Sequence, residues 1–67
     1  MGAVLKGKLD YFDVSRGFGF IRNLDTQEKY FVHVTEMLEE IKENDIVTFE
    51  LERGMKGMNA VRVKKAE

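Results

Sequence analysis

The sequence has 67 residues, and 34% of them are charged. Its formal net charge is −1, and it contains no cysteine. This length predicts one domain over residues 1–67 with a thin core, because a chain of about 60 residues buries only about 60% of its unfolded surface. The lack of cysteine excludes disulfides, thiolate metal sites and cysteine nucleophiles. No apolar run of about 18 residues exists, which excludes a membrane-spanning helix. The first residues become charged too early for a secretory signal, so we expect a cytoplasmic protein without a membrane partner.

The charges are unevenly distributed along the chain. Residues 36–52 carry seven acids and one lysine, whereas residues 53–67 carry five bases and one acid. Residues 1–35 are nearly balanced, with five bases and four acids. If the two ends meet in space, this distribution would allow a mildly basic face opposite an acidic one.

The first predicted strand covers residues 3–13, where Leu5, Gly7, Leu9 and Tyr11 share one parity. The adjacent aromatic residues at its end predict an irregularity or bulge at Tyr11 and Phe12. A loop is expected over residues 13–17. Residues 18–23 and 29–34, rich in aromatic and β-branched side chains, predict the second and third strands, joined by a turn over 24–28.

A short helical segment is predicted after the third strand. Thr35 is a suitable N-cap, and the spacing of Leu38 and Ile41 predicts one or two helical turns over residues 35–41. Residues 46–53 alternate as a fourth strand with Val47, Phe49 and Leu51 inward.

The two glycines of residues 54–59 predict a flexible loop. The fifth strand follows over 60–64, with Val61 and Val63 inward and Arg62 and Lys64 outward. Five short strands with one helical turn predict an all-β, small Greek-key barrel, because closing the sheet removes exposed strand edges.

Aromatic residues of the second and third strands can share one face of the sheet. Side chains two residues apart point the same way, which groups Phe18 with Phe20 and Phe31 with His33. Neighbouring strands would set these groups about 5 Å apart, or about 7–8 Å on the diagonal. Exposed rings suit the bases of single-stranded nucleic acid, and Tyr11 or Phe12 can extend the set. The loop cations Arg16 and Lys56 are candidates for phosphate contacts.

The alternative for these phenylalanines is core packing, since phenylalanine is usually buried. The opposite parity, however, carries side chains that can fill a core without them: Ile21, Tyr30, Val32 and Val34. We therefore expect Phe18, Phe20 and Phe31 to be exposed and Phe49 to be buried. His33 has no second histidine or cysteine to share a metal, and no metal, cofactor or catalytic residue is expected. A solvated acidic face is expected from Glu36, Glu39, Glu40 and Glu43.

Two motifs resemble those of a known family. Residues 16–21 (RGFGFI) resemble the first ribonucleoprotein motif of the bacterial cold-shock proteins, and residues 30–34 (YFVHV) resemble the second. Residues 7–13 (GKLDYFD), 46–52 and 54–60 (GMKGMNA) resemble the family's first strand, fourth strand and following loop. The resemblance implies a five-stranded antiparallel barrel of the OB type that binds single-stranded RNA and DNA, often as an RNA chaperone. Carried over by position, it implies a binding face of Tyr11, Arg16, Phe18, Phe20, Phe31 and His33, with Lys56 at the edge.

Several positions depart from the family's pattern. Tyr11 stands in place of tryptophan, Asp10 in place of lysine and Asp13 in place of asparagine, and the segment before Val47 is shorter and has no aromatic residue. We expect weaker binding than in a typical member, because Asp10 and Asp13 would repel phosphate.

Two functions remain open. The first is a module that binds single-stranded RNA or DNA with low sequence specificity. The second is an OB-fold protein-interaction module that uses the same aromatic face. A monomer is expected, with a dimer as the alternative.

Overall fold

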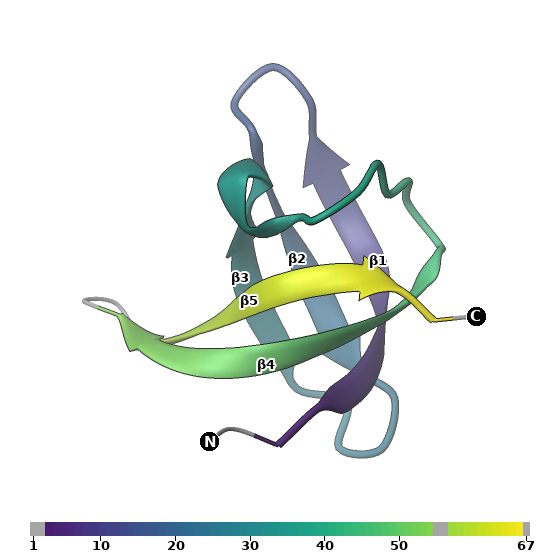
Figure 1. Ribbon diagram of the computed structural model, residues 1–67, viewed down its shortest axis with the longest axis vertical. Helices are drawn as coiled ribbons and strands as arrows, with labels where there is room; N and C mark the ends of the chain where they lie inside the picture. Colours follow the sequence, from purple (N-terminus) through teal and green to yellow (C-terminus); the bar gives the residue numbers. More distant parts are fainter. Residues whose placement is uncertain (1–2, 55–56, 67) are drawn as a thin grey trace.

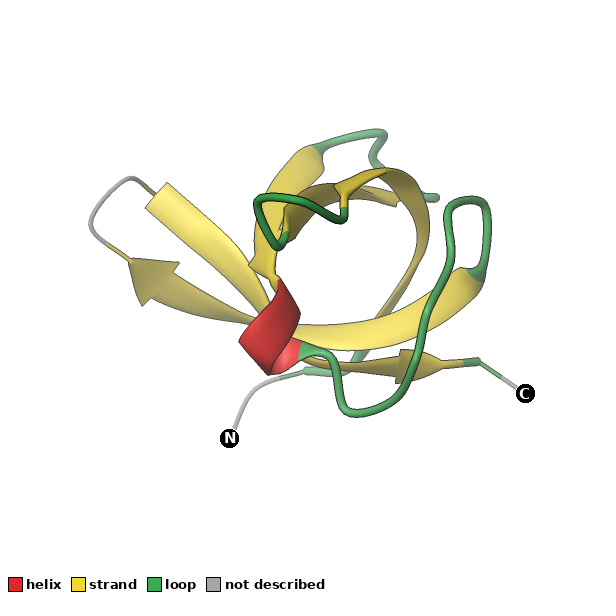
Figure 2. Cartoon of the chain, turned by 90° about the horizontal axis from the view of Figure 1, so that it is seen from above, coloured by secondary structure: helices red, strands yellow, loops and turns green. Residues whose placement is uncertain are grey.

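The computed structural model describes residues 3–54 and 57–66, and within them five strands close into a barrel in the order β1-β2-β3-β5-β4. The strands are β1 (Leu5–Asp13), β2 (Phe18–Asn23), β3 (Lys29–His33), β4 (Ile46–Gly54) and β5 (Gly57–Lys65). One 3-10 turn, η1 (Val34–Glu36), follows β3. Seen from above, the strands enclose the core as a ring, and the β4–β5 hairpin extends away from it (Figures 1 and 2). The predicted all-β barrel with one helical turn is confirmed.

Alternating apolar residues on each strand form the core. The fully buried cluster contains side chains from all five strands and from the segment before β4: Leu9, Ile21, Val32, Ile41, Val47, Phe49, Ala60 and Val63. The predicted burial of Phe49, which is 1% exposed, is confirmed. Because the side chains at alternate positions of each strand form this core, the remaining side chains of β2 and β3 face outward.

Strand pairing differs from the prediction in one respect. Four of the ladders are antiparallel, but β3 and β5 pair in parallel through Phe31↔Asn59 and Val32↔Ala60. The parallel ladder is only these two pairs long. An entirely antiparallel sheet was therefore the wrong expectation. The parallel pair arises because β5 closes the barrel between β3 and β4.

The helix predicted over residues 35–41 is limited to η1, one turn that begins a residue earlier. His33, not Thr35, is its N-cap. After it the chain is extended, because Met37 forms a parallel bridge with Val63 and the Leu38 N–H donates to the Val63 carbonyl at 2.8 Å. Pairing with β5 thus replaces the helical hydrogen bonds.

Two apolar side chains near η1 are more exposed than the sequence suggested. Leu38 is exposed, whereas Ile41 reaches the core, so they do not share one buried helical side. Val34 was expected inward with Tyr30 and Val32. It is exposed because β3 ends at His33 and the chain turns into η1.

The fifth strand is longer than predicted. Part of the expected loop over residues 54–59 belongs to the β4–β5 hairpin, which continues to the pair Gly54↔Gly57. Val61 and Val63 point inward and Arg62 outward, as predicted. An irregularity in register between Thr48 and Glu50 accompanies a positive φ of 50° at Arg62.

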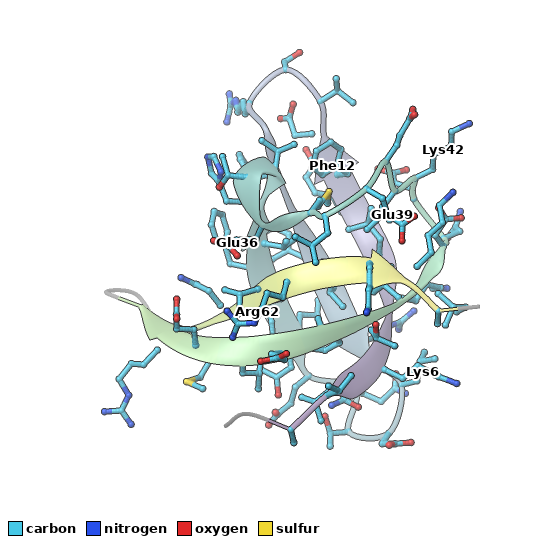
Figure 3. All side chains as sticks on the ribbon, in the orientation of Figure 1. Lys6, Phe12, Glu36, Glu39, Lys42 and Arg62 are labelled. Carbon is cyan, nitrogen blue, oxygen red and sulfur yellow. The ribbon has the colours of Figure 1, made fainter. Side chains whose placement is uncertain are left out.

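The acidic and basic segments are interleaved, and they are not separated into the two faces that their distribution along the chain would allow. Arg62 donates to Glu50 at 2.9 and 3.0 Å, and its backbone N–H donates to Glu36 at 3.4 Å. Figure 3 shows Glu36 and Arg62 side by side although they are far apart in the sequence. The Lys65 N–H donates to Glu39 at 2.7 Å. Glu36 and Glu39 are therefore acceptors for backbone donors of β5, and they are not merely part of a solvated face.

Candidate nucleic-acid interface

The register between β2 and β3 places four ring-bearing side chains on one outward face. Phe18 pairs with His33 and Phe20 pairs with Phe31, while the intervening Gly19 and Val32 are buried. We call the rings of Tyr11, Phe18, Phe20, Phe31 and His33 the aromatic face. The grouping of the β2 and β3 rings that period-2 alternation predicted is confirmed.

The phenylalanine rings of the aromatic face contact one another. Phe18 and Phe31 are stacked, with centroids 5.6 Å apart, and Phe20 meets each of them edge-on at 6.2 Å. Phe20 and Phe31 are 36% and 37% exposed. Phe18 is only half-buried rather than exposed, because the parallel Phe31 ring covers one of its sides. Among the three phenylalanines of this face, Phe20 and Phe31 are therefore the more exposed.

A bulge in β1 adds Tyr11 to this face. The register with β2 shifts between Leu9 and Tyr11, so that Asp10 is the extra residue. Beyond the shift, Phe12 packs against the core and Tyr11 is 46% exposed with its ring 6.3 Å from Phe20. The predicted irregularity exists, one residue earlier than expected. It reverses the parity that had grouped Tyr11 with Leu9.

Beyond the bulge, a backbone donor of β1 is paired with a side chain, because the ladder with β4 includes only residues 5–8 of β1. The Phe12 N–H donates to the Glu43 carboxylate at 2.9 Å. Glu43 comes from the segment before β4, so this contact links the bulged end of β1 to that segment. Like Glu36 and Glu39, Glu43 has a structural partner that its sequence position did not reveal.

His33 is held at the end of the face by its role as the η1 cap. Its Nδ1 accepts from the Thr35 N–H at 3.2 Å and lies 3.0 Å from the Thr35 hydroxyl. Because Nδ1 accepts, the ring proton is assigned to Nε2. The ring is exposed, so it can stack against a base while Nε2–H donates outward.

The predicted loop cations have different outcomes. Arg16 is exposed in the turn between β1 and β2. Its backbone N–H donates to the Asp13 carboxylate at 3.1 Å, and its side-chain Nε lies 3.8 Å from the same carboxylate. Asp13 also accepts from the Tyr11 hydroxyl at 3.4 Å. Asp13 therefore offsets part of the charge of Arg16 beside the aromatic face. Lys56 lies outside the described residues.

Two cations on the outward parity of β2 and β3 were not predicted from the sequence. Arg22 and Lys29 face each other in register, two residues along each strand from the Phe20–Phe31 pair. Both contact Asp10, Arg22 at 3.1 Å and Lys29 at 3.5 Å. The signal was available, since Arg22 follows Phe20 by two residues and Lys29 precedes Phe31 by two. Asp10 thus binds two cations of the protein, and it is not simply an isolated negative charge.

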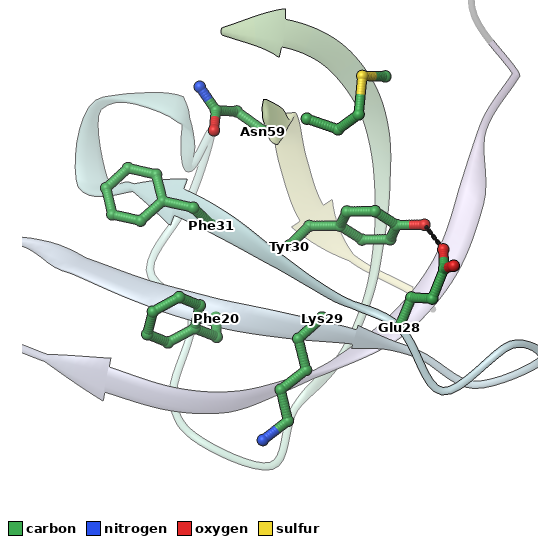
Figure 4. A pocket seen from close by; sticks show the side chains of 7 residues that line it. Phe20, Glu28, Lys29, Tyr30, Phe31 and Asn59 are labelled. Atoms are coloured by element: carbon green, nitrogen blue, oxygen red, sulfur yellow. Dashed lines mark hydrogen bonds between the residues drawn. The ribbon is translucent and has the colours of Figure 1, made fainter. Parts of the chain in front are cut away.

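An open pocket lies at the edge of the face where β3 diverges from the β4–β5 hairpin. It is lined by Phe20, Glu28, Lys29, Tyr30, Phe31, Met58 and Asn59 (Figure 4). The divergence follows from the short β3–β5 ladder, which starts only at Phe31. Within the pocket the Tyr30 hydroxyl donates to Glu28 at 2.6 Å, and this hydrogen bond, with partial burial, raises the pKa of Tyr30. Apolar walls with a few polar groups are typical of ligand-binding pockets.

The described part of the chain gives no sign of a metal centre. Within residues 3–54 and 57–66, no group of three or more histidine, aspartate or glutamate side chains is placed to hold a metal ion. No helix in the same residues is long and apolar enough to cross a membrane. The groups that converge on the aromatic face are rings, cations and carboxylates.

Comparison with known families agrees with this geometry. A family model described as the "'Cold-shock' DNA-binding domain" matches residues 5–66. The chain belongs to the cold-shock domain family. Its similarity to curated family members extends over nearly the whole of both sequences. It is 38% identical over 65 residues to cold shock-like protein CspC of Shigella flexneri, covering 91% of this chain and 94% of the relative.

Other family members show similar agreement. The chain is 37% identical over 67 residues to a cold shock-like protein of Thermotoga maritima, covering 94% of this chain and all of the relative. It is 36% identical over 63 residues to the major cold shock protein of Micrococcus luteus, covering 88% and 94%. Among solved structures, Drosophila Unr CSD456 superposes with a TM-score of 0.82 at 30% identity, covering 98% of this chain and 28% of that longer chain. The cold-shock domain family is a nucleic-acid-binding family, and none of these names describes a catalytic activity.

Proposed function

We propose that this protein binds single-stranded RNA, and also DNA, by stacking bases on the aromatic face with low sequence specificity. The observation that carries the proposal is the cluster of mutually contacting rings on one outward sheet face, with Phe20 and Phe31 each more than a third exposed. A base that stacks on an aromatic ring contributes about 1–3 kcal/mol whatever its identity, because every base has a flat π-face.

The same surface accounts for a role as an RNA chaperone or a cold-shock-type regulator of transcription or translation in the cytoplasm. Bases held on the aromatic face are unavailable for pairing within the strand or with another strand. Such a role requires weak, sequence-tolerant binding, so that the strand is released again. Acidic side chains offset part of the positive charge beside the rings. Asp13 lies beside Arg16, and Asp10 lies beside Arg22 and Lys29. This partial neutralisation of the cations favours weak binding of nucleic acid.

The proposal is tested by titrating the protein with a short pyrimidine-rich single strand and following tyrosine fluorescence. The protein has no tryptophan, and Tyr11 on the aromatic face would be quenched by a stacked base. Phe20→Ala and Phe31→Ala are each expected to weaken binding by about 1–3 kcal/mol, or about 5–150-fold. Leu38→Ala is the matched control, since Leu38 is 62% exposed and not part of the aromatic face.

The thermal midpoint of each variant must be measured beside its affinity. Removal of a side chain that is more than a third exposed creates little cavity, so the phenylalanine variants are expected to stay folded. Equal affinity of wild type, Phe20→Ala and Phe31→Ala would contradict base stacking on this face.

One observation favours a second function, the docking of a protein partner on the same face. Acidic side chains contact the nearby cations, while Tyr11, Phe20, Phe31 and Met58 expose apolar surface. A salt titration separates the two functions. Affinity for nucleic acid should fall steeply with salt, since counterions are released when phosphates are neutralised, whereas apolar docking should not.

A further inference from the structure

The starting observation is the position of Arg22 and Lys29 on the sheet. They pair with each other two residues along the strands from Phe20↔Phe31, on the same parity and therefore on the same outward face. Lys29 also lines the open pocket together with Phe20 and Phe31 (Figure 4). A strand whose bases stack on these two rings would carry its phosphates past two cations of adjacent strands.

The β1 bulge places a carboxylate against these cations. Asp10 is the extra residue at the register shift, next to the outward Tyr11. One carboxylate oxygen lies 3.1 Å from an Arg22 terminal nitrogen, and the other lies 3.5 Å from Lys29 Nζ. The Asp10 side chain is 18% exposed, so it is better covered than either partner. One negative charge thus offsets half of the positive charge of the pair.

The ion pairs leave much of the donor capacity of both cations unused. A guanidinium has five N–H donors, and in the described residues only one Arg22 nitrogen, a terminal one, donates to Asp10. The Arg22 side chain is 33% exposed, although its Nε is buried. The Lys29 side chain is 60% exposed, and its three donors meet Asp10 only at 3.5 Å. The geometry can therefore accept an additional anion, or exchange Asp10 for one.

We propose that Arg22 and Lys29 form a phosphate-binding subsite of the aromatic face, and that Asp10 competes with nucleic-acid phosphate for it. The ligand class is the phosphodiester of a single strand. Asp10 holds the two cations, so a bound strand makes fewer phosphate contacts with them than it would in the absence of this carboxylate. This inference rests on the proposed function. It assigns to Asp10 a competitive role that limits affinity, and to Arg22 and Lys29 the phosphate contacts.

The test compares Asp10→Asn with Asp25→Asn. Both substitutions remove one negative charge and retain a similar shape. Asp25 is an exposed turn residue whose carboxylate makes no hydrogen bond or ion pair in the described part of the chain. It therefore controls for the change in net charge. The probe is a short fluorescein-labelled oligothymidylate, and the affinity is measured by anisotropy over a range of salt concentrations.

The proposal expects Asp10→Asn to bind more tightly than Asp25→Asn at low salt, with a steeper dependence on salt. Each additional phosphate neutralised on a single strand steepens the slope of log K against log salt by about 0.7. Two additional contacts would steepen it by about 1.4, so the advantage of Asp10→Asn would shrink about sevenfold between 50 and 200 mM salt. Addition of Lys29→Gln to Asp10→Asn should remove part of the gain and make the slope shallower again.

Two results would overturn the inference while leaving the proposed function intact. The first is equal affinity and equal slope for Asp10→Asn and Asp25→Asn. The second is weaker binding by Asp10→Asn with an unchanged thermal midpoint, which would make Asp10 a contact to the ligand and not a competitor. If the wild type and every variant fail to bind at low salt, the proposed function and this inference fall together.

Discussion

Gly19 of β2 leaves no room for a side chain against β1, and its replacement by alanine should test how the aromatic face is supported. It is buried and lies opposite Phe12 in the ladder. A Cβ at this position would overlap the backbone carbonyl oxygen of Tyr11 and lie 3.0 Å from both Cα and Cδ1 of Phe12. The obstacle is mostly backbone, so the strands themselves would have to separate.

The size of the effect follows from two opposing contributions. Loss of unfolded-state entropy on Gly→Ala would by itself stabilise the protein by about 0.4–1 kcal/mol. Overpacking a well-packed site costs about 1–3 kcal/mol and sometimes more, and a backbone obstacle places Gly19→Ala at the upper end, near 3 kcal/mol. A chain of this length is expected to have only about 3–10 kcal/mol of stability. The steric cost therefore dominates and leaves a net loss of about 2–2.6 kcal/mol. At about 4–8 °C per kcal/mol, the midpoint should fall by about 8–21 °C.

Thermal unfolding followed by circular dichroism measures this shift, with Gly54→Ala as the control. A Cβ on Gly54 would meet chiefly the side-chain amide of Asn59, which can rotate away. Gly54→Ala should therefore change the midpoint by only a few degrees. A Gly19→Ala midpoint equal to that of Gly54→Ala would refute the steric reasoning.

Two further predictions concern Tyr30 and Glu43. The pKa of Tyr30 is raised above 10.0, chiefly by the hydrogen bond to Glu28 and to a smaller extent by partial burial and by the negative charge of Glu28. In Tyr11→Phe, which leaves Tyr30 as the sole tyrosine, the absorbance titration should have a midpoint above pH 10 that falls after Glu28→Gln. The stability from this group is present below pH 10 and lost as pH rises through the folded-state pKa; an unchanged midpoint in Glu28→Gln would contradict the assignment. Glu43→Ala removes the acceptor of the Phe12 N–H and should lower the free energy of unfolding, measured by urea denaturation, by about 1 kcal/mol. The control Glu40→Ala, at an exposed position, should stay within about 0.5 kcal/mol of wild type, and an equal effect of both substitutions would argue against the bulge contact.

Local alternation was sufficient to predict most of the aromatic face. Phe18 and Phe20 on β2, and Phe31 and His33 on β3, point outward because both strands are regular and pair without a register shift. In a regular strand the direction of a side chain depends only on its parity. The same rule would have added Arg22 and Lys29, had the outward parity been followed beyond the rings.

Features that depend on contacts between distant segments could not be obtained in this way. The position of the β1 bulge, which exposes Tyr11 and brings Asp10 to Arg22 and Lys29, depends on the register with β2. The extended chain after η1 depends on Met37 pairing with Val63 of β5. Local propensity favoured a helix there, but hydrogen bonds to a strand edge replaced it.

The barrel class, the core parity of the regular strands and the outward rings of β2 and β3 could thus be predicted from the residues alone, because these depend on residue type and a period of two. The electrostatics, in contrast, depended on the fold. Glu36, Glu39 and Glu43 became acceptors for distant backbone N–H groups, and Asp10 became the partner of two cations on neighbouring strands. A charge acts through its distance to other charges and donors, and across a barrel that distance is set by strand register and closure.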